Sequence, residues 1–205
     1  MFTGIVKGLG SIVSLEEKAG LRSFVVELPA GYGAGLQRGA SVAIDGVCLT
    51  TTEIEGDRVR FDAMQETLDK TLVGGYTVGS QVNVERSFQA GDEVGGHIVS
   101  GHVTGMGEIV SIETPANNHV VTFRVPIEWM KYILPKGFIA LDGCSLTIVE
   151  VNREAGIFTV WLIPETLTVT TFGTKQVGAR VNVELDPQTR AIVDTVENYL
   201  LTNRL

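Results

Sequence analysis

Short stretches in which polar and apolar residues alternate recur along the whole chain. Residues 58–62, 81–85 and 180–184 are three of them, each with apolar side chains at every second position. Alternation of this kind places the apolar side chains on one face and is typical of a half-buried β-strand. Glycine, proline and charged residues interrupt the stretches roughly every eight to twelve residues. The pattern predicts about six short strands in each half of the chain, closed into a small antiparallel barrel.

The two halves of the chain repeat one another. Residues 4–16 align with residues 101–113 without a gap, 97 positions apart, and 8 of the 13 aligned residues are identical. The Asp-Gly turn of residues 45–50 returns 97 positions later, and the Glu-Thr-Leu of residues 66–68 returns 99 positions later. A repeat of this length indicates two copies of one folding unit. The predicted fold is therefore all-β, with two tandem homologous six-stranded antiparallel barrels of the Greek-key type.

The end of the chain has no copy in the first half. Asp186 followed by Pro187 is the sequence signature of a helix start. Apolar residues then follow at spacings of three and four, which predicts an amphipathic C-terminal α-helix: Ile192, Val193, Val196, Tyr199 and Leu200. The helix could be a lid packed on its own barrel or a self-association helix, and we favour the second. The expected domains are residues 1–97, 98–186 and 187–205.

Composition excludes several classes of function. The formal net charge of −8 argues against a nucleic-acid backbone as partner. The start of the chain lacks the basic and apolar regions of a signal peptide, and no stretch approaches the ~18 apolar residues of a membrane span. Cys48 and Cys144 are far apart and belong to no Cys-x-x-Cys motif. They are interpreted as free thiols, which favours a cytoplasmic location.

Two of the three histidines lie close together near the middle of the chain. His97 and His102 are five residues apart, so their side chains diverge on a strand or a helix and form a poor metal pair. His102 aligns with Ile5 of the first copy, and Cys48 aligns with Ser145 of the second. This difference suggests one ligand shape bound twice in different reactive surroundings. The alternative is a pair of barrels with incidental polar residues.

Four motifs together resemble riboflavin synthase of the alpha-chain type. They are residues 1–6, the paired Asp-Gly-x-x-Leu-Thr segments, residues 95–102 and residues 163–167, and the similarity covers essentially the whole chain. The resemblance implies a transferase that moves a four-carbon unit between two molecules of 6,7-dimethyl-8-ribityllumazine, giving riboflavin and 5-amino-6-ribitylaminouracil. It implies no cofactor and no metal. It also implies a homotrimer assembled through the C-terminal helix, with each active site between the first barrel of one subunit and the second barrel of its neighbour, and association with lumazine synthase.

The resemblance also carries over a set of substrate-binding positions in two cups, one for each barrel. The first cup would use Gly4, Ile5, Val6, Cys48, Leu49, Thr50, Asp62, Ala63, Met64, Gln65, Glu66 and Thr67. The second would use Gly101, His102, Val103, Ser145, Leu146, Thr147, Trp161, Leu162, Ile163, Pro164, Glu165 and Thr166, with Lys136 at its edge. Trp161 departs from the family pattern, in which a smaller or polar residue is expected.

Seven positions match residues that the family associates with turnover: Phe2, Thr3, Ser41, Cys48, His97, His102 and Asp186. We expect His102 to transfer the proton of the acidic C7 methyl group, because histidine titrates near neutral pH. Cys48, Thr50 and Ser41 would orient the acceptor lumazine or add to it.

Two other functions compete with this interpretation. A non-catalytic lumazine or flavin carrier shares the fold, but it would lose the polar groups of the second cup, whereas this chain retains His102, Ser145 and Thr147. A small-barrel interaction module for nucleic acid would need aromatic and basic surfaces, which 7% aromatic residues and a net charge of −8 do not favour.

Overall fold

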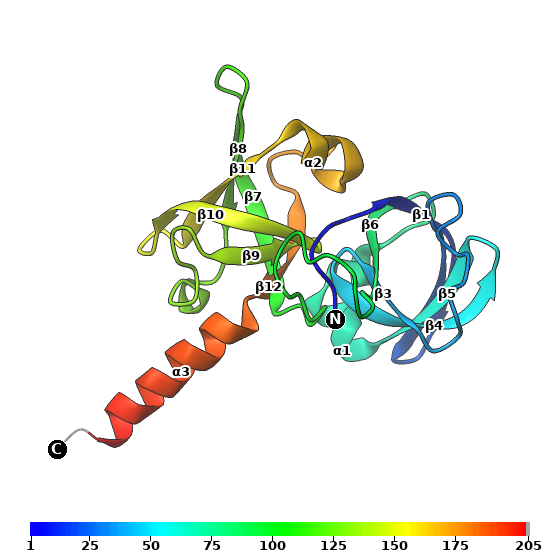
Figure 1. The fold of residues 1–205 in the computed structure, drawn as a ribbon, viewed down its shortest axis with the longest axis horizontal. Coiled ribbons are helices and arrows are strands. Elements are labelled where there is room, and N and C mark those ends of the chain that lie inside the picture. The colour runs from blue at the N-terminus through cyan, green and yellow to red at the C-terminus, as the bar shows by residue number, and fades with distance from the viewer. Residues whose placement is uncertain (204–205) are drawn as a thin grey trace.

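The computed structural model describes residues 1–203 and contains two closed six-stranded antiparallel barrels. Figure 1 shows the barrels side by side, with the C-terminal helix extending away from them. The strands of the first barrel are β1 (Gly8–Lys18), β2 (Leu21–Glu27), β3 (Ser41–Ile44), β4 (Val47–Glu55), β5 (Arg58–Met64) and β6 (Gln81–Arg86). Those of the second are β7 (Gly105–Glu113), β8 (His119–Arg124), β9 (Phe138–Leu141), β10 (Cys144–Asn152), β11 (Ile157–Leu162) and β12 (Arg180–Leu185).

Both barrels have the same strand order. In the first the order around the barrel is β1-β2-β5-β4-β3-β6, and the second repeats it with β7-β8-β11-β10-β9-β12. The consecutive strands β2 and β3 are not neighbours, which is the crossing connection of a Greek key. The predicted fold class is therefore confirmed.

Short helices, which the strand pattern did not predict, follow the fifth strand of each barrel. α1 (Gln65–Lys70) and the 3₁₀ turn η1 (Leu72–Gly75) lie between β5 and β6, and α2 (Pro164–Val169) and η3 (Thr171–Gly173) lie between β11 and β12. A further 3₁₀ turn, η2 (Ile127–Trp129), precedes β9. A six-residue helix is too short to produce a clear hydrophobic period, so its sequence signal is weak.

Each barrel has its own hydrophobic core. The alternating positions of the strands point inward and are fully buried, among them the stacked rings of Phe123 and Phe158 in the second barrel. In the first barrel Phe24 and Phe61 form a second aromatic pair, with ring centroids 5.9 Å apart, one pair of positions along the strands from the equivalents of Phe123 and Phe158. Burial of such aromatic side chains supplies much of the favourable free energy of each barrel.

The segments that precede the two barrels are exchanged. We call residues 1–7 and 98–104 the leading segments. The carbonyl of Gly4 accepts a hydrogen bond from the Ser145 amide of the second barrel at 2.8 Å, and the carbonyl of Gly101 accepts one from the Cys48 amide of the first at 2.9 Å. Val6 packs in the core of the second barrel, and Val103 packs against the core of the first. Each barrel is therefore completed by the segment that leads into the other.

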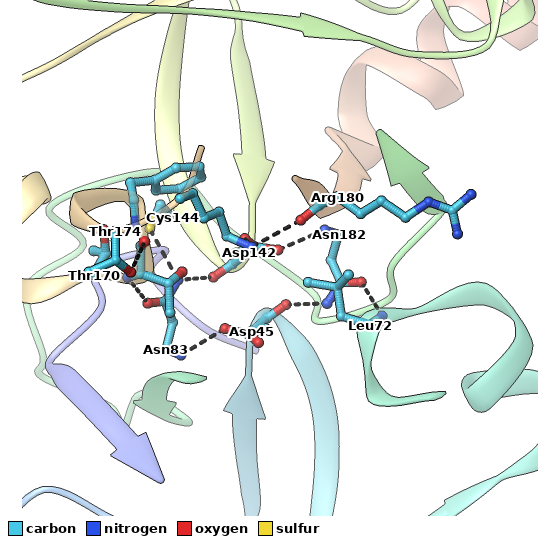
Figure 2. A network of polar contacts seen from close by, with 12 residues as sticks. Asp45, Leu72, Asn83, Asp142, Cys144, Thr170, Thr174, Arg180 and Asn182 are labelled. Carbon is cyan, nitrogen blue, oxygen red and sulfur yellow. Dashed lines mark hydrogen bonds and ion pairs between the residues drawn. The ribbon is translucent and has the colours of Figure 1, made fainter. Parts of the chain in front are cut away.

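A buried polar network related by approximate two-fold symmetry joins the two barrels (Figure 2). Asp45 accepts a hydrogen bond from the amide of Asn83 at 2.7 Å, and Asp142 accepts the equivalent bond from the amide of Asn182 at 2.7 Å. The side-chain amide of Asn83 then donates to the Asp142 carbonyl, and that of Asn182 donates to the Asp45 carbonyl. Because these four bonds form two matching pairs across the junction, the network fixes the relative position of the barrels.

The symmetry of this network fails at one pair of positions. The carboxylate of Asp45 accepts a hydrogen bond from the neutral hydroxyl of Tyr76 at 2.8 Å, whereas that of Asp142 pairs with the ammonium of Lys175 at 3.0 Å. Both carboxyl groups are buried, and the Lys175 ammonium pairs directly with that of Asp142. Burial, together with the charge of Asp142, raises the pKa of Asp45 to about 7.

This pKa gives a pH dependence of stability. Asp45 keeps its proton in the folded state up to about pH 7 but loses it near pH 3.8 when unfolded. The free energy of unfolding should therefore fall as the pH rises from about 4 to 7. The Asp45→Asn variant keeps the shape and tolerates the left-handed backbone at this position (φ 44°). We expect urea titrations between pH 4 and 8 to show a flatter profile for the variant than for the wild type.

Asp142→Asn is the matched comparison, because it leaves the Lys175 ammonium without its buried partner. This variant should be destabilised across the whole pH range. Parallel pH profiles for the wild type and Asp45→Asn would contradict the proposed protonation of Asp45.

The helix α3 (Pro187–Thr202) begins where the sequence predicted. The side chain of Asp186 accepts hydrogen bonds from the amides of Gln188 and Thr189, so Asp186 is its N-cap. None of its residues is buried, and Lys131, which follows η2 in the second barrel, pairs with Asp194 and Glu197 in the middle of the helix. Figure 1 shows the helix leading away from the second barrel. The alternative of a lid packed on its own barrel is therefore wrong.

Candidate functional site

The first cup lies on the outside of the first barrel, where β4 meets α1. It is a cavity of about 240 Å³ lined by Cys48 of β4, by Glu66 and Thr67 of α1, and by His102 and Val103 of the second leading segment. Leu49 points into the core, whereas its neighbours Cys48 and Thr50 face outward. The strand alternation predicted that Cys48 and Thr50 share a face, and this is confirmed.

The second cup occupies the equivalent place on the second barrel. It is a cavity of about 380 Å³ lined by Ser145 of β10, by Glu165 and Thr166 of α2, and by Gly4 and Ile5 of the first leading segment. The side chain of Ile5 is 36% exposed in this cavity, whereas Val6 next to it is buried in the core. The two cups therefore share a frame of one strand, one short helix and one leading segment.

The expected assignment of the leading segments to the cups was wrong. Residues 4–6 were expected in the first cup and residues 101–103 in the second, and the structure places them the other way round. The physical reason is the exchange of hydrogen bonds from Gly4 to Ser145 and from Gly101 to Cys48. His102 therefore faces Cys48, and Ile5 faces Ser145.

Buried carboxylates hold both leading segments in place. Glu85 accepts hydrogen bonds from the amide and hydroxyl of Thr3 and from the amide of Gly4 at 2.6 to 3.1 Å. Glu184 binds the amide and hydroxyl of Ser100 and the amide of Gly101 in the same way, at 2.7 to 2.8 Å. Burial raises the pKa of Glu85, while these three donors favour its charged form. Thr3 thus positions the rim of the second cup and does not line it.

His97 belongs to the second cup, although it lies in the segment between the barrels. Its Nδ1 is 2.6 Å from the hydroxyl of Ser145, and its ring stacks on Phe138 with centroids 5.2 Å apart. Burial lowers the pKa of His97, and the charges of Asp186 and Glu184 oppose that shift. A neutral His97 can therefore accept the Ser145 proton or donate one to its oxygen, depending on its tautomer.

The other residues expected to act in turnover lie at different places in the structure. Phe2 is completely buried between the barrels, where its amide and carbonyl bond to Val99. Ser41 lies opposite Thr50 at the edge of β3, near the first cup. Asp186 caps α3. Neither Phe2 nor Asp186 lines a cup of its own chain, so we assign both a positioning role.

Some of the residues expected to bind lumazine line the cavity of a cup, and others lie beside a cavity without lining it. Met64, Trp161 and Ile163 are exposed on the outer face, and of these only Ile163 lines a cavity. Lys136 is exposed in the turn before β9 and lines neither cavity. The remaining positions that neighbour the cavities without lining them are Leu49, Thr50, Asp62, Ala63, Gln65, Thr147, Leu162 and Pro164.

Several residues that line the cups were missed at the sequence level. Lys70 and Thr71 line the first cup, and Lys7, Cys144 and Val169 line the second. Lys70 and Val169 end the two short helices, so recognising those helices would have pointed to them. Burial raises the pKa of the Cys144 thiol, which makes it a poor nucleophile.

Two further properties concern the described chain as a whole. Within residues 1–203, no group of three or more His, Cys, Asp or Glu side chains could hold a metal ion. In the same range no helix has both the length and the apolar character needed to cross a membrane. A larger hollow of about 530 Å³ lies on the first barrel, lined by strand residues such as Glu53, Arg58 and Arg60, and neither leading segment lines it.

Comparison with known proteins places both barrels in one family. The lumazine binding domain matches residues 3–87 and again residues 100–186. Riboflavin synthase of Escherichia coli (strain K12) is 54% identical over 201 residues, which cover 98% of this chain and 93% of that protein. Riboflavin synthase of Buchnera aphidicola subsp. Schizaphis graminum (strain Sg) is 43% identical over 201 residues, covering 98% of this chain and 96% of that protein. The crystal structure of LumP complexed with riboflavin is similar with a TM-score of 0.82 at 26% identity, covering 90% of this chain and 99% of that one.

Proposed function

Because this chain belongs to the riboflavin synthase family and is an enzyme of riboflavin biosynthesis, we propose how its two cups carry out the reaction. Each cup binds one molecule of 6,7-dimethyl-8-ribityllumazine. A four-carbon unit passes from one lumazine to the other, and riboflavin and 5-amino-6-ribitylaminouracil leave. The observation that carries this proposal is the pair of cups with one frame and different polar groups: Cys48 and His102 in one, Ser145 and His97 in the other.

Two equivalent cups suit a reaction that consumes two copies of one substrate. The shared frame explains how both cups can accept the same ring, and the different polar groups explain how the two molecules can react differently. Holding both rings in register replaces an encounter in solution by an effectively unimolecular step, for which effective molarities of about 10⁵ M or more are known. Positioning is therefore the main contribution that we assign to the cups.

Proton transfer is the second contribution. His102 is exposed at the rim of the first cup, next to Cys48, and its amide is held by the Ser100 hydroxyl at 3.1 Å. We assign His102 the role of base toward the acidic C7 methyl group of the lumazine in that cup. Cys48 and Ser41 orient this lumazine, and Ser145 with His97 does the same in the second cup.

We further propose that the active site forms between subunits of a homotrimer. The apolar stripe of α3 is largely exposed within its own chain: Ile192, Val196 and Leu200 are 65%, 51% and 57% exposed. Exposed apolar residues at helical spacing are typical of a self-association surface. In the trimer that we propose, the first cup of one subunit faces the second cup of the next, as the family resemblance implies. Association with lumazine synthase is proposed only from the family resemblance.

A single charge on the stripe tests the role of α3. Val196→Asp should convert the trimer to monomers in sedimentation velocity, because the carboxylate would have to be buried among apolar side chains. The barrels should keep their thermal stability, since Val196 is exposed and belongs to neither hydrophobic core. Thr195→Asp adds the same charge beside the stripe and should remain a trimer. A trimeric Val196→Asp protein would contradict the proposed assembly.

The reaction itself has a direct test. The protein is mixed with 6,7-dimethyl-8-ribityllumazine alone, and riboflavin absorbance is followed together with lumazine consumption. Our proposal predicts one riboflavin for every two lumazines consumed. A carrier would bind the lumazine and form no riboflavin, which would support the alternative of a non-catalytic lumazine protein. The polar groups retained in the second cup, Ser145 and His97, favour the enzyme.

A further inference from the structure

One row of outward-facing side chains differs between the two barrels. In the second barrel Phe138 pairs with Thr147, and the pairing of Ile148 with Val160 places Trp161 beside Thr147 on the other side. In the first barrel Ser41 pairs with Thr50, and Asp62 lies beside Thr50 in the same register. The two rows are therefore equivalent, with Phe138 in place of Ser41 and Trp161 in place of Asp62.

The row of the first barrel is polar and that of the second is aromatic. The carboxylate of Asp62 accepts a hydrogen bond from the hydroxyl of Ser23 at 2.5 Å, and the residue equivalent to Ser23 is Val120, which pairs with Trp161. Trp161 and Phe138 are 51% and 49% exposed. Large aromatic side chains so exposed lack the burial that normally stabilises them, so a flat partner placed on them would gain contact area.

This aromatic row borders the second cup. Trp161 and Ile163 are two residues apart at the end of β11 and are both exposed on the outer face, and Ile163 lines the cavity. Phe138 stacks on His97, whose Nδ1 contacts the hydroxyl of Ser145 in the same cavity. A planar ring that enters the cup and extends along the strands would therefore meet this row.

We propose that Trp161 and Phe138 form an aromatic wall of the second cup, against which the tricyclic ring of riboflavin lies. The wall makes the second cup the tighter flavin site, because the first cup offers Asp62 and Ser41 at the same places. A tricyclic ring covers more of such a wall than the two-ring lumazine, so the preference concerns the product more than the substrate. This inference rests on the proposed function and adds a difference in affinity between the cups.

The test is a calorimetric titration of the whole protein with riboflavin, which as the product binds without turnover. For the wild type we expect two classes of site per chain. In Trp161→Asp, which copies the first cup, the tighter class should weaken on the order of tenfold to a hundredfold, the range of one aromatic stacking contact. Trp161→Phe should retain most of the affinity, and Phe138→Ser should weaken the same class. Val177→Asp, a change at an exposed valine in the turn before β12, is the matched control and should bind as the wild type does.

Three outcomes would overturn the inference. Equal riboflavin affinity for Trp161→Asp and the wild type would exclude the wall. Equal weakening of both classes would point to a general change in the protein. Loss of the trimer in sedimentation with unchanged riboflavin affinity per chain would assign Trp161 to a subunit contact. None of these depends on whether the wild type converts lumazine to riboflavin, so failure of the proposed function remains distinguishable.

Discussion

Replacing His102 with glutamine is expected to lower kcat by about two to four orders of magnitude, the usual contribution of a general base. Glutamine fills the same volume and keeps a polar group at the rim of the first cup, but it cannot take up a proton near neutral pH. The lumazine Kd should change far less, because Cys48, Thr67 and the backbone of the leading segment still form the cup. Stopped-flow rates and equilibrium binding, measured on one preparation, separate the two effects.

His119→Gln is the matched control for this experiment. His119 opens β8 and lines neither cup, so the same substitution there should leave kcat within about twofold of the wild type, as expected for a residue outside the site. If His102→Gln turned over lumazine at the wild-type rate, the base would have to be another group. If it lost affinity and kcat in equal measure, His102 would be a binding residue.

Gly101→Ala is expected to destabilise the protein by about 2 to 4 kcal/mol and to close the first cup. Gly101 has a φ of +81°, and a Cβ atom there would lie 2.5 Å from the Cβ of Cys48 and 2.9 Å from the ring of Phe2. The second leading segment must therefore move away from β4, and His102 moves with it. Urea unfolding measures the stability, and a lumazine titration should show the loss of one of two sites.

Gly178→Ala separates steric overlap from backbone strain. Gly178 has a similar φ of +88°, but nothing lies within 4 Å of the Cβ position, so only the strain of the left-handed backbone remains. This variant should lose about 1 kcal/mol and keep both sites. If Gly101→Ala and Gly178→Ala lost equal stability, the close approach of Gly101 to Cys48 would add nothing to the cost of the substitution, and the predicted steric overlap would be contradicted.

The sequence was sufficient for the architecture because the architecture follows from local patterns. The 97-residue repeat predicted two copies of one unit, and period-two alternation in stretches such as residues 58–62 predicted the strands. The N-cap at Asp186 predicted the start of α3, since the capping interaction is local. Each of these features depends on neighbours in sequence or on a second copy of the same pattern.

The site was less predictable because it depends on contacts between distant segments. The residue types around Ile5 and His102 indicate a cup, but nothing in their order says that each leading segment crosses to the other barrel. That choice is set by the hydrogen bonds of Gly4 and Gly101 and by the burial of Val6 in the second core. The burial of Asp45 and Asp142 also could not be predicted from the sequence, because an Asp-Gly turn is ordinarily exposed.

Co-expression of two defective chains tests most directly whether the reacting cups come from neighbouring subunits. His102→Gln disables the first cup, and Gly4→Ala, with a Cβ 2.5 Å from that of Ser145, disables the second. In mixed trimers with a head-to-tail arrangement, about a quarter of the sites would pair two intact cups. We therefore predict about a quarter of the wild-type rate of riboflavin formation from the mixture and almost none from either variant alone. A mixture of confirmed hybrid trimers that stays as inactive as its parts would show that both cups must come from one chain, and would contradict the account.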